Sequence, residues 1–253
     1  MKSIFSLSRP LRLLWLLPAV WCTSCSYSLV YSPSVNLPVK PLSRGDIDVK
    51  GGVELFPETR PLKERKTSPG GHLTLGYGIN DKTSVYAKGW IDFSGRGIYD
   101  TRSGFSLSAV STLKTFNDRM RLLLIPKAGM VLDGKYRGGY GAELPVLLHY
   151  RVRPDLGVYG GFGFLYGLHD FDKHPDLYGD MKLQAGWAVT NHLGASMNVW
   201  KQLNVNIELT TLFQHNYRYS DRDKPTNWLF APTIGIGYVF KTRKAAEAHV
   251  PKP

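Results

Sequence analysis

The sequence predicts an all-β fold, a single up-and-down antiparallel transmembrane β-barrel of about ten strands, with eight to twelve strands also fitting. The first observation is an alternation of apolar and polar side chains, which indicates strands with two unlike faces. In LNVNIELTTLF (203–213), Val205 and Ile207 lie on one face and Asn206 and Glu208 on the other. The second observation is that short and long connections alternate along the chain, as they do in transmembrane barrels.

Ten segments carry this alternation. In chain order they are 45–56, 72–78, 84–93, 105–113, 119–132, 140–152, 156–168, a strand that starts after 179 and ends at 200, 203–217 and 230–240. The fourth segment is the least regular. In the first, second, third and fifth segments the apolar face comprises Ile47, Val49, Val53 and Leu55; Leu73, Leu75 and Tyr77; Val85, Ala87, Ile91 and Phe93; and Met120, Leu122, Leu124, Ala128 and Met130.

The later segments have the same two faces. Their apolar residues are Ala142, Leu144, Val146, Leu148, Tyr150 and Val152; Val158, Phe162, Phe164 and Tyr166; Leu203, Val205, Ile207, Leu209 and Phe213; and Ile234, Ile236, Tyr238 and Phe240. Short turns are expected at 80–83, 116–119, 153–155 and 201–202, and longer loops at 57–70, 95–104, 133–139, 169–179 and 217–227. An even number of strands places both ends of the barrel on the short-turn side, which is the periplasmic side of such barrels.

The N-terminus has the features of an export signal of the lipoprotein type, predicted over residues 1–24. Basic residues precede LRLLWLLPAVW (11–21), an apolar run too short to span a bilayer. In the following CTSC, Cys25 comes after two small residues, whereas Cys22 follows the bulky Trp21. Cys25 is therefore the predicted lipidation site. A plain signal peptide with cleavage nearby is the alternative.

The rest of the chain divides by composition. Residues 25–44 contain several prolines and serines and are predicted to form a lipidated N-terminus and periplasmic tether. Residues 45–241 are the predicted barrel, and residues 242–253 a basic tail. The 253 residues carry 32 Lys and Arg against 20 Asp and Glu, a net charge of +12. This favours anionic partners, namely membrane lipid and lipopolysaccharide. Nucleic acid is not expected because no nucleic-acid-binding motif is present.

Alternation does not decide which face meets water, since a soluble lipocalin-like barrel also alternates, with its apolar face inward. Three features favour the inverted arrangement: a consistently apolar face with aromatic residues towards strand ends, many small residues on the other face, and charges of both signs on that face. We expect these charges to form a network in the lumen. Its predicted members are Asp46, Asp48, Lys50, Glu54, Lys88, Asp92, Arg119, Arg121, Lys127, Glu143, Arg151 and Glu208.

The segment after Cys25 reads VYSPSVNLPV (30–39) and contains Tyr31, Pro33, Asn36 and Pro38. The first predicted strand then opens with Gly45-Asp46. This order resembles a family of small outer-membrane β-barrel lipoproteins from Bacteroidota, with Asn36 one place early. The hairpin 76–93 also looks like that family's second and third strands, so the likeness covers about residues 22–95. It implies an outer-membrane location and a barrel fold. Members are mostly of unassigned function, so it implies no reaction.

No catalytic or nucleotide-binding motif such as HExxH, GxSxG, CxxC or a P-loop is present, so an enzyme is not expected, and neither is a cofactor. The loop HDFDKHPD (169–176) contains possible metal ligands, but a solvated loop is the commoner case and no metal site is predicted. A barrel hydrolase would need a pair such as His192 with Ser196, or His215 with Asp221 or Asp223. Four cations in the loop 58–66 are candidates for lipopolysaccharide contact: Arg60, Lys63, Arg65 and Lys66.

The sequence therefore predicts a barrel anchored through Cys25 at the periplasmic side of the outer membrane, with a structural or surface-interaction role. Ten strands leave a narrow bore, which the charged network would largely fill. Two alternatives stay open, a soluble periplasmic lipid- or ligand-binding barrel lipoprotein and a narrow anion-preferring channel. Ligand, conductance, protein partner and oligomeric state are not determined by the sequence.

Overall fold

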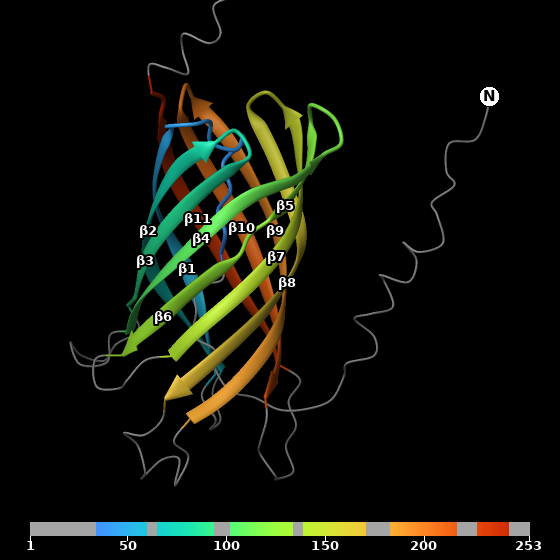
Figure 1. Cartoon of the computed structure of the whole chain (residues 1–253). Coiled ribbons are helices and arrows are strands. Elements are labelled where there is room, and N and C mark those ends of the chain that lie inside the picture. Colours follow the sequence, from blue (N-terminus) through green and yellow to red (C-terminus); the bar gives the residue numbers. More distant parts are fainter. Residues whose placement is uncertain are drawn as a thin grey trace, which may run out of the picture.

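Ten antiparallel strands close into a barrel in the computed structural model of the chain (Figure 1). The structure describes residues 34–59, 65–93, 102–133, 139–170, 183–216 and 227–242. Eleven labelled segments make up these ten strands, because β5 and β6 are two pieces of one strand: β1 (Ile47–Thr59), β2 (Arg65–Asn80), β3 (Thr83–Asp92), β4 (Arg102–Thr115), β5 (Met120–Leu124), β6 (Lys127–Asp133), β7 (Gly139–Arg153), β8 (Leu156–Asp170), β9 (Leu183–Trp200), β10 (Leu203–Asn216) and β11 (Asn227–Phe240). Apart from β5 and β6, each pairs with its neighbours in the chain, and β11 pairs with β1, so the predicted up-and-down topology is confirmed.

β5 and β6 form one strand of the barrel. Both pair with β4 on one side and with β7 on the other. The interruption falls at Pro126, which has no N–H to donate to the ladder. The preceding residue, Ile125, still donates its N–H to the carbonyl of Pro145 in β7. The two pieces therefore correspond to the single segment predicted at 119–132, and the count of ten strands is confirmed.

Several strands are longer than the alternation predicts, and the largest extension lies at the end away from the short turns. β2 begins at Arg65 rather than at 72, because its pairing with β1 continues through Pro69 and two glycines to Thr59. β9, whose start the sequence left open, has 18 residues and β2 has 16. A tilted strand of about 9–11 residues crosses a bilayer. The wall is therefore long enough to project beyond the membrane on the long-loop side.

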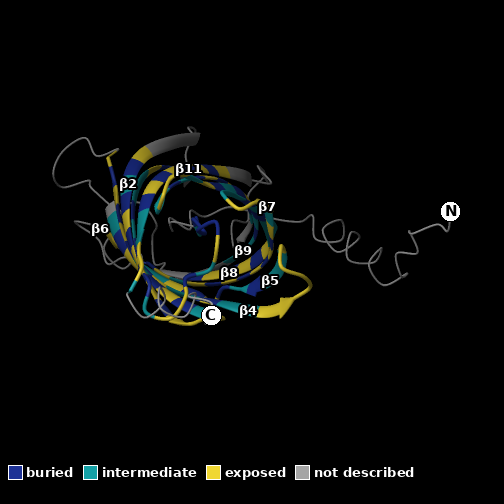
Figure 2. Cartoon of the chain, turned by 90° about the horizontal axis from the view of Figure 1, so that it is seen from above, coloured by how far each residue is buried: buried dark blue, intermediate teal, exposed yellow. Residues whose placement is uncertain are grey.

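The outer surface of the barrel is apolar and its interior is largely polar. On β10 the side chain of Ile207 is 56% exposed, whereas those of its neighbours Asn206 and Glu208 are buried. Exposed and buried residues alternate in this way around the barrel (Figure 2). A soluble barrel would have the opposite arrangement. The described residues contain no helix that is long and apolar enough to cross a membrane.

The interior is not polar throughout, which corrects the simple two-face interpretation. Apolar and aromatic side chains of β3, β4, β5, β7 and β8 and of the residue after β5 also face inward and pack in one cluster with residues that precede β1. The cluster comprises Leu37, Leu42, Tyr86, Val110, Leu123, Ile125, Leu147 and Tyr159. A second cluster, Leu165, Ala188, Leu212 and Ala231, lies on the inner faces of β8 to β11. Both clusters fill parts of the lumen that water would otherwise occupy.

The segment 34–44, part of the predicted periplasmic tether, lies inside the barrel for most of its length (Figures 1 and 2). Leu37, Val39 and Leu42 are each only 2% exposed. The segment runs through the lumen to the short-turn end, where Gly45 donates its N–H to the carbonyl of Gly78 at 2.7 Å and the chain turns into β1. The tether interpretation is therefore wrong for residues 34–42, which we call the lumen plug. Burial of its apolar side chains favours this place within the barrel, and side chains of the wall bind the backbone groups that would otherwise be buried without partners.

Candidate functional site

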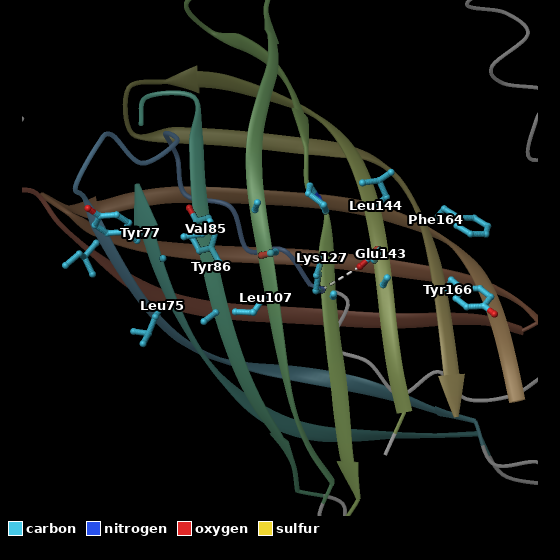
Figure 3. A pocket seen from close by; sticks show the side chains of 18 residues that line it. Leu75, Tyr77, Val85, Tyr86, Leu107, Lys127, Glu143, Leu144, Phe164 and Tyr166 are labelled. Carbon is cyan, nitrogen blue, oxygen red and sulfur yellow. Dashed lines mark ion pairs between the residues drawn. The ribbon is translucent and has the colours of Figure 1, made fainter. Parts of the chain in front are cut away.

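The middle of the lumen holds a belt of buried charged side chains, which we call the charged belt. Its Lys–carboxylate pairs are Lys50–Asp48 at 2.8 Å, Lys88–Glu54 at 2.7 Å and Lys127–Glu143 at 3.6 Å. Figure 3 shows the last of these pairs between β6 and β7. Each strand contributes these residues at every second position, so the register of the closed sheet brings them into one layer. Because the charges are buried, this pairing is what makes the layer tolerable in a barrel interior.

His192 of β9 joins two carboxylates of the charged belt. Its Nε2 lies 2.9 Å from Oε1 of Glu143 in β7, and its Nδ1 lies 3.1 Å from Oε1 of Glu208 in β10. Both partners are acceptors when ionised, so a doubly protonated ring satisfies them best. Hydroxyl groups of Thr190 and Thr210 donate to the same two carboxylates, at 2.7 and 3.0 Å. The three side chains therefore act as a fixed frame in the wall.

Glu208 is the principal contact between this frame and the lumen plug. Its carboxylate accepts the backbone N–H of Val35 at 2.9 Å and that of Asn36 at 2.6 Å. It also accepts the hydroxyl of Tyr159 in β8 at 2.7 Å. That hydroxyl in turn accepts the N–H of Leu37 at 3.4 Å. Three consecutive amides of the plug are thus bound by side chains of the wall.

Lysines of the charged belt bind the carbonyl groups of the plug. Lys50 donates to the carbonyl of Asn36, and Lys127 donates to that of Ser34 at 3.4 Å. Lys88 donates to the hydroxyl of Ser34, which itself donates to Glu54 at 3.0 Å. Hydrogen bonds to charged groups are stronger than those between neutral groups. The plug is therefore held through its main chain by charges of both signs.

The conformation of Asn36 suits this binding. Its φ angle is 51°, in the left-handed region that asparagine tolerates better than most residues. The reversal of direction lets the N–H of Asn36 meet Glu208 while its carbonyl meets Lys50. The next side chain, Leu37, then packs in the apolar cluster at the short-turn end. Polar and apolar contacts are therefore made by adjacent residues.

Tyr159 reaches the plug only because β9 has a glycine beside it. Gly194 pairs with Tyr159 across β8 and β9, and a Cβ at Gly194 would overlap the tyrosine ring. We expect Gly194→Ala to lower the free energy of unfolding by about 1–3 kcal/mol, the usual cost of overpacking. Urea unfolding followed by tryptophan fluorescence measures this. Gly89→Ala is the control because nothing lies within 4 Å of a Cβ there; equal losses in both variants would contradict the prediction.

Nine of the twelve residues predicted for the lumen network are buried on the inner face: Asp46, Asp48, Lys50, Glu54, Lys88, Asp92, Lys127, Glu143 and Glu208. Asp46 has a local role, since it accepts the N–H of Ser43 at 3.1 Å in the turn before β1. Arg119 is a correction: it is exposed, in the turn before β5. The side chain of Asn117 accepts the N–H groups of Arg119 and Met120, which holds this turn and delays the start of the strand.

The remaining two, Arg121 and Arg151, are half-buried towards the short-turn end. They belong to a group of cations around Lys40, at the end of the plug. Partial burial lowers the pKa of Lys40 below its usual value, and the positive charges of Arg151, Lys241 and Arg121 lower it further. The predicted network is thus divided between a paired belt in the middle and a cationic group at the mouth.

The other predicted site residues are placed as follows. Cys25, Arg60 and Lys63 lie outside the described residues, whereas Arg65 and Lys66 begin β2 and pair with Thr59 and Glu58 of β1. In the loop predicted at 169–176, His169 and Asp170 belong to β8, and the other candidate ligands lie outside the described residues. In the part of the chain that the structure describes, no group of three His, Cys, Asp or Glu side chains is arranged to hold a metal ion.

The possible hydrolase pairs do not form a site among the described residues. His192 and Ser196 share the inner face of β9 but are four residues apart, a separation of about 13 Å along a strand. His192 is bound instead by Glu143 and Glu208. Asp221 and Asp223, the proposed partners of His215, lie outside the described residues.

Sequence reasoning missed the plug, the tyrosine Tyr159 that binds it through a hydrogen bond, and His192, which holds the carboxylate of Glu208 that binds the plug. A signal for the plug was present. Leu123 and Leu147 lie at inner positions of their strands, among charged residues. Leucine side chains at these positions would be unfavourable if the lumen were filled with water. Such apolar residues indicate that something apolar packs against them. The segment VNLPV (35–39) supplies it.

The outer surface has a broad apolar groove of about 1080 Å³ (Figure 3). Its floor is formed by small residues of the middle strands and the linking proline: Ala87, Ala109, Pro126, Ala128 and Ala142. Larger side chains flank it, with Tyr77 and Leu75 of β2 on one side and Phe164 and Tyr166 of β8 on the other. A groove of this chemistry on the outer face suits acyl chains rather than polar ligands.

No family model matches the chain, and no curated protein matches it in sequence. Comparison with solved structures finds distant similarities to outer-membrane proteins. The COG4313 outer membrane channel from Pseudomonas putida F1 is 14% identical with a TM-score of 0.48, covering 80% of this chain and 98% of that chain. Ail, the attachment invasion locus protein of Yersinia pestis, is 10% identical with a TM-score of 0.36, covering 78% and 99%.

The outer membrane protease OmpT from Escherichia coli is 14% identical with a TM-score of 0.38, covering 78% of this chain and 94% of that chain. The three proteins are a channel, an attachment protein and a protease. At these identities the likeness does not extend to function, because one fold carries many different sites. The role of the chain has to be argued from its own residues.

Proposed function

We propose that the chain is an outer-membrane β-barrel protein whose lumen is closed by its own residues 34–42, with a structural or surface-interaction role rather than a permeation role. One observation carries this proposal. The plug occupies the lumen and binds the wall through both its backbone and its apolar side chains. A narrow barrel filled in this way has little free cross-section. The plug therefore argues against the alternative of a narrow anion-preferring channel.

The outward apolar face supports placement in the outer membrane. β1 begins and β11 ends at the short-turn end, which supports both ends of the barrel facing the periplasm. We also propose that Cys25 carries a lipid anchor. The length of β2 and β9 supports a wall that rises above the membrane. There it would present loops to other molecules. The cations Arg60, Lys63, Arg65 and Lys66 remain our candidates for contact with lipopolysaccharide phosphates.

The Cys25→Ala protein, which keeps the barrel without its proposed anchor, tests this function. We expect it to stay in the membrane fraction and to migrate differently on gels before and after boiling. In planar bilayers it should show no steady conductance, because the plug fills the pore. A protein released from membranes, with mobility unchanged by boiling, would contradict the membrane barrel. A stable, large conductance would instead contradict the closed lumen and favour the channel.

A further inference from the structure

We propose that the interior wall is a binding site for an extended peptide, and that residues 34–42 occupy it as an internal ligand. This rests on the proposed closed barrel and adds the chemical class of its ligand. The wall is complete without the plug. Every strand of the barrel is paired with other strands along both of its edges, and none of these pairings involves residues 34–42. The plug is thus bound to the barrel as a ligand is, by side chains.

The contacts define what the site recognises. Glu208 binds two consecutive N–H groups, while Lys127 and Lys50 bind the carbonyls of the residues at positions 34 and 36. These groups are present in any peptide, so they fix its position without regard to sequence. Such main-chain recognition resembles that of other extended-peptide sites.

Specificity comes from three further features. The residue at position 36 has to adopt a positive φ angle, which favours asparagine or glycine. The next residue has to be apolar, since Leu37 packs against Leu123, Leu147 and other residues of the inner cluster. The residue at position 34 has to be small with a hydroxyl group, because Ser34 lies between Lys88 and Glu54. The expected ligand is a segment of the pattern Ser-x-Asn-Leu, with the asparagine in the left-handed conformation.

In the intact protein the internal segment outcompetes any free peptide. A tethered ligand acts at an effective concentration in the millimolar range, so a micromolar peptide rarely finds the site vacant. Weakening the plug without altering the wall should therefore reveal the site. Asn36→Pro does this, because proline lacks the N–H that Glu208 binds and has its φ fixed near −65°. Asn36→Gly is the matched control, since it keeps both the N–H and access to the positive φ.

The experiment uses the full-length Cys25→Ala protein in detergent and a fluorescent peptide, PSVNLPVKPL, that copies residues 33–42. Fluorescence anisotropy measures binding. We expect the Asn36→Pro variant to bind with an apparent affinity at least roughly tenfold higher than the parent protein or Asn36→Gly, because a vacant site is more often available. The same peptide with proline in place of its asparagine should bind weakly to all three.

Heat-modifiable gel mobility shows whether each variant has folded. If Asn36→Pro does not fold, Leu37→Asn replaces it, because this change removes the apolar anchor of the plug and keeps all wall residues. Absence of saturable binding to a folded plug variant would overturn the inference. Binding to the parent protein and to Asn36→Gly that is as tight as binding to Asn36→Pro would also overturn it, because the peptide would then bind outside the lumen. Neither result affects the closed barrel, which the conductance of the parent protein tests separately.

Discussion

Glu208→Ala is expected to lower the free energy of unfolding by about 3–5 kcal/mol, the cost of removing one partner from a buried charged pair. The substitution leaves the cationic ring of His192 with one carboxylate instead of two. It also leaves the N–H groups of Val35 and Asn36 and the hydroxyl of Tyr159 without their acceptor. Chemical unfolding in detergent or lipid, followed by tryptophan fluorescence, measures the loss.

Two controls separate this effect from a general loss of charge. Glu208→Gln keeps the shape of the side chain and one acceptor oxygen, and should lose less stability. Asp155→Ala removes a carboxylate from an exposed pair, in which Arg153 lies 3.3 Å from Asp155. Exposed pairs contribute about 0–1 kcal/mol, so this variant should be nearly unchanged. Equal stability of the Glu208→Ala and Asp155→Ala variants would contradict the role of Glu208 in holding the plug.

Ile207→Arg, one residue away, is expected to lower the free energy of unfolding in lipid by about 2–4 kcal/mol, the cost of an arginine facing the middle of a bilayer. Ile207 is 56% exposed on the outer face of β10, in line with Val205 and Leu209. The physical cause is the transfer of a charged group into hydrocarbon rather than a change in packing. Unfolding of the barrel in vesicles measures it.

The control for Ile207→Arg places the same side chain in water. Asp81 is exposed in the short turn between β2 and β3, so Asp81→Arg should change stability little. A soluble barrel predicts a different outcome, because an exposed isoleucine would then meet water and arginine would be tolerated. Stability of Ile207→Arg equal to that of Asp81→Arg would therefore contradict the lipid-facing surface.

The strands could be predicted because alternation is a local property of the chain. β10 shows this best, since its apolar and polar residues alternate without interruption from Leu203 to Thr210. Where the alternation fails, prediction fails too. The Ser-Pro-Gly-Gly stretch of β2 contains no alternation, and its pairing with β1 is set by the continuing ladder instead. The ends of the strands therefore depend on pairing with a neighbouring strand, and the sequence alone does not give the register of that pairing.

The candidate site was predictable only in part. The buried charges share a parity with polar neighbours, which is visible in the sequence. The sequence does not show which of these residues contact each other. Glu143, His192 and Glu208 come from β7, β9 and β10 and are brought together by the register of three strand pairings. Arg119, on the same parity, was excluded from the interior by a turn.

The local order of residues determines the strands of the barrel and their two faces, because neighbouring residues of a strand point to opposite sides of the sheet independently of the rest of the fold. The place of residues 34–42 is a different matter. Their prolines and serines suit a tether as well as a plug, and the choice depends on groups far away in the chain. Only the closed wall puts the carboxylate of Glu208, the ammonium groups of Lys50 and Lys127 and the apolar cluster around one segment at once. Burial of that segment follows from these contacts acting together.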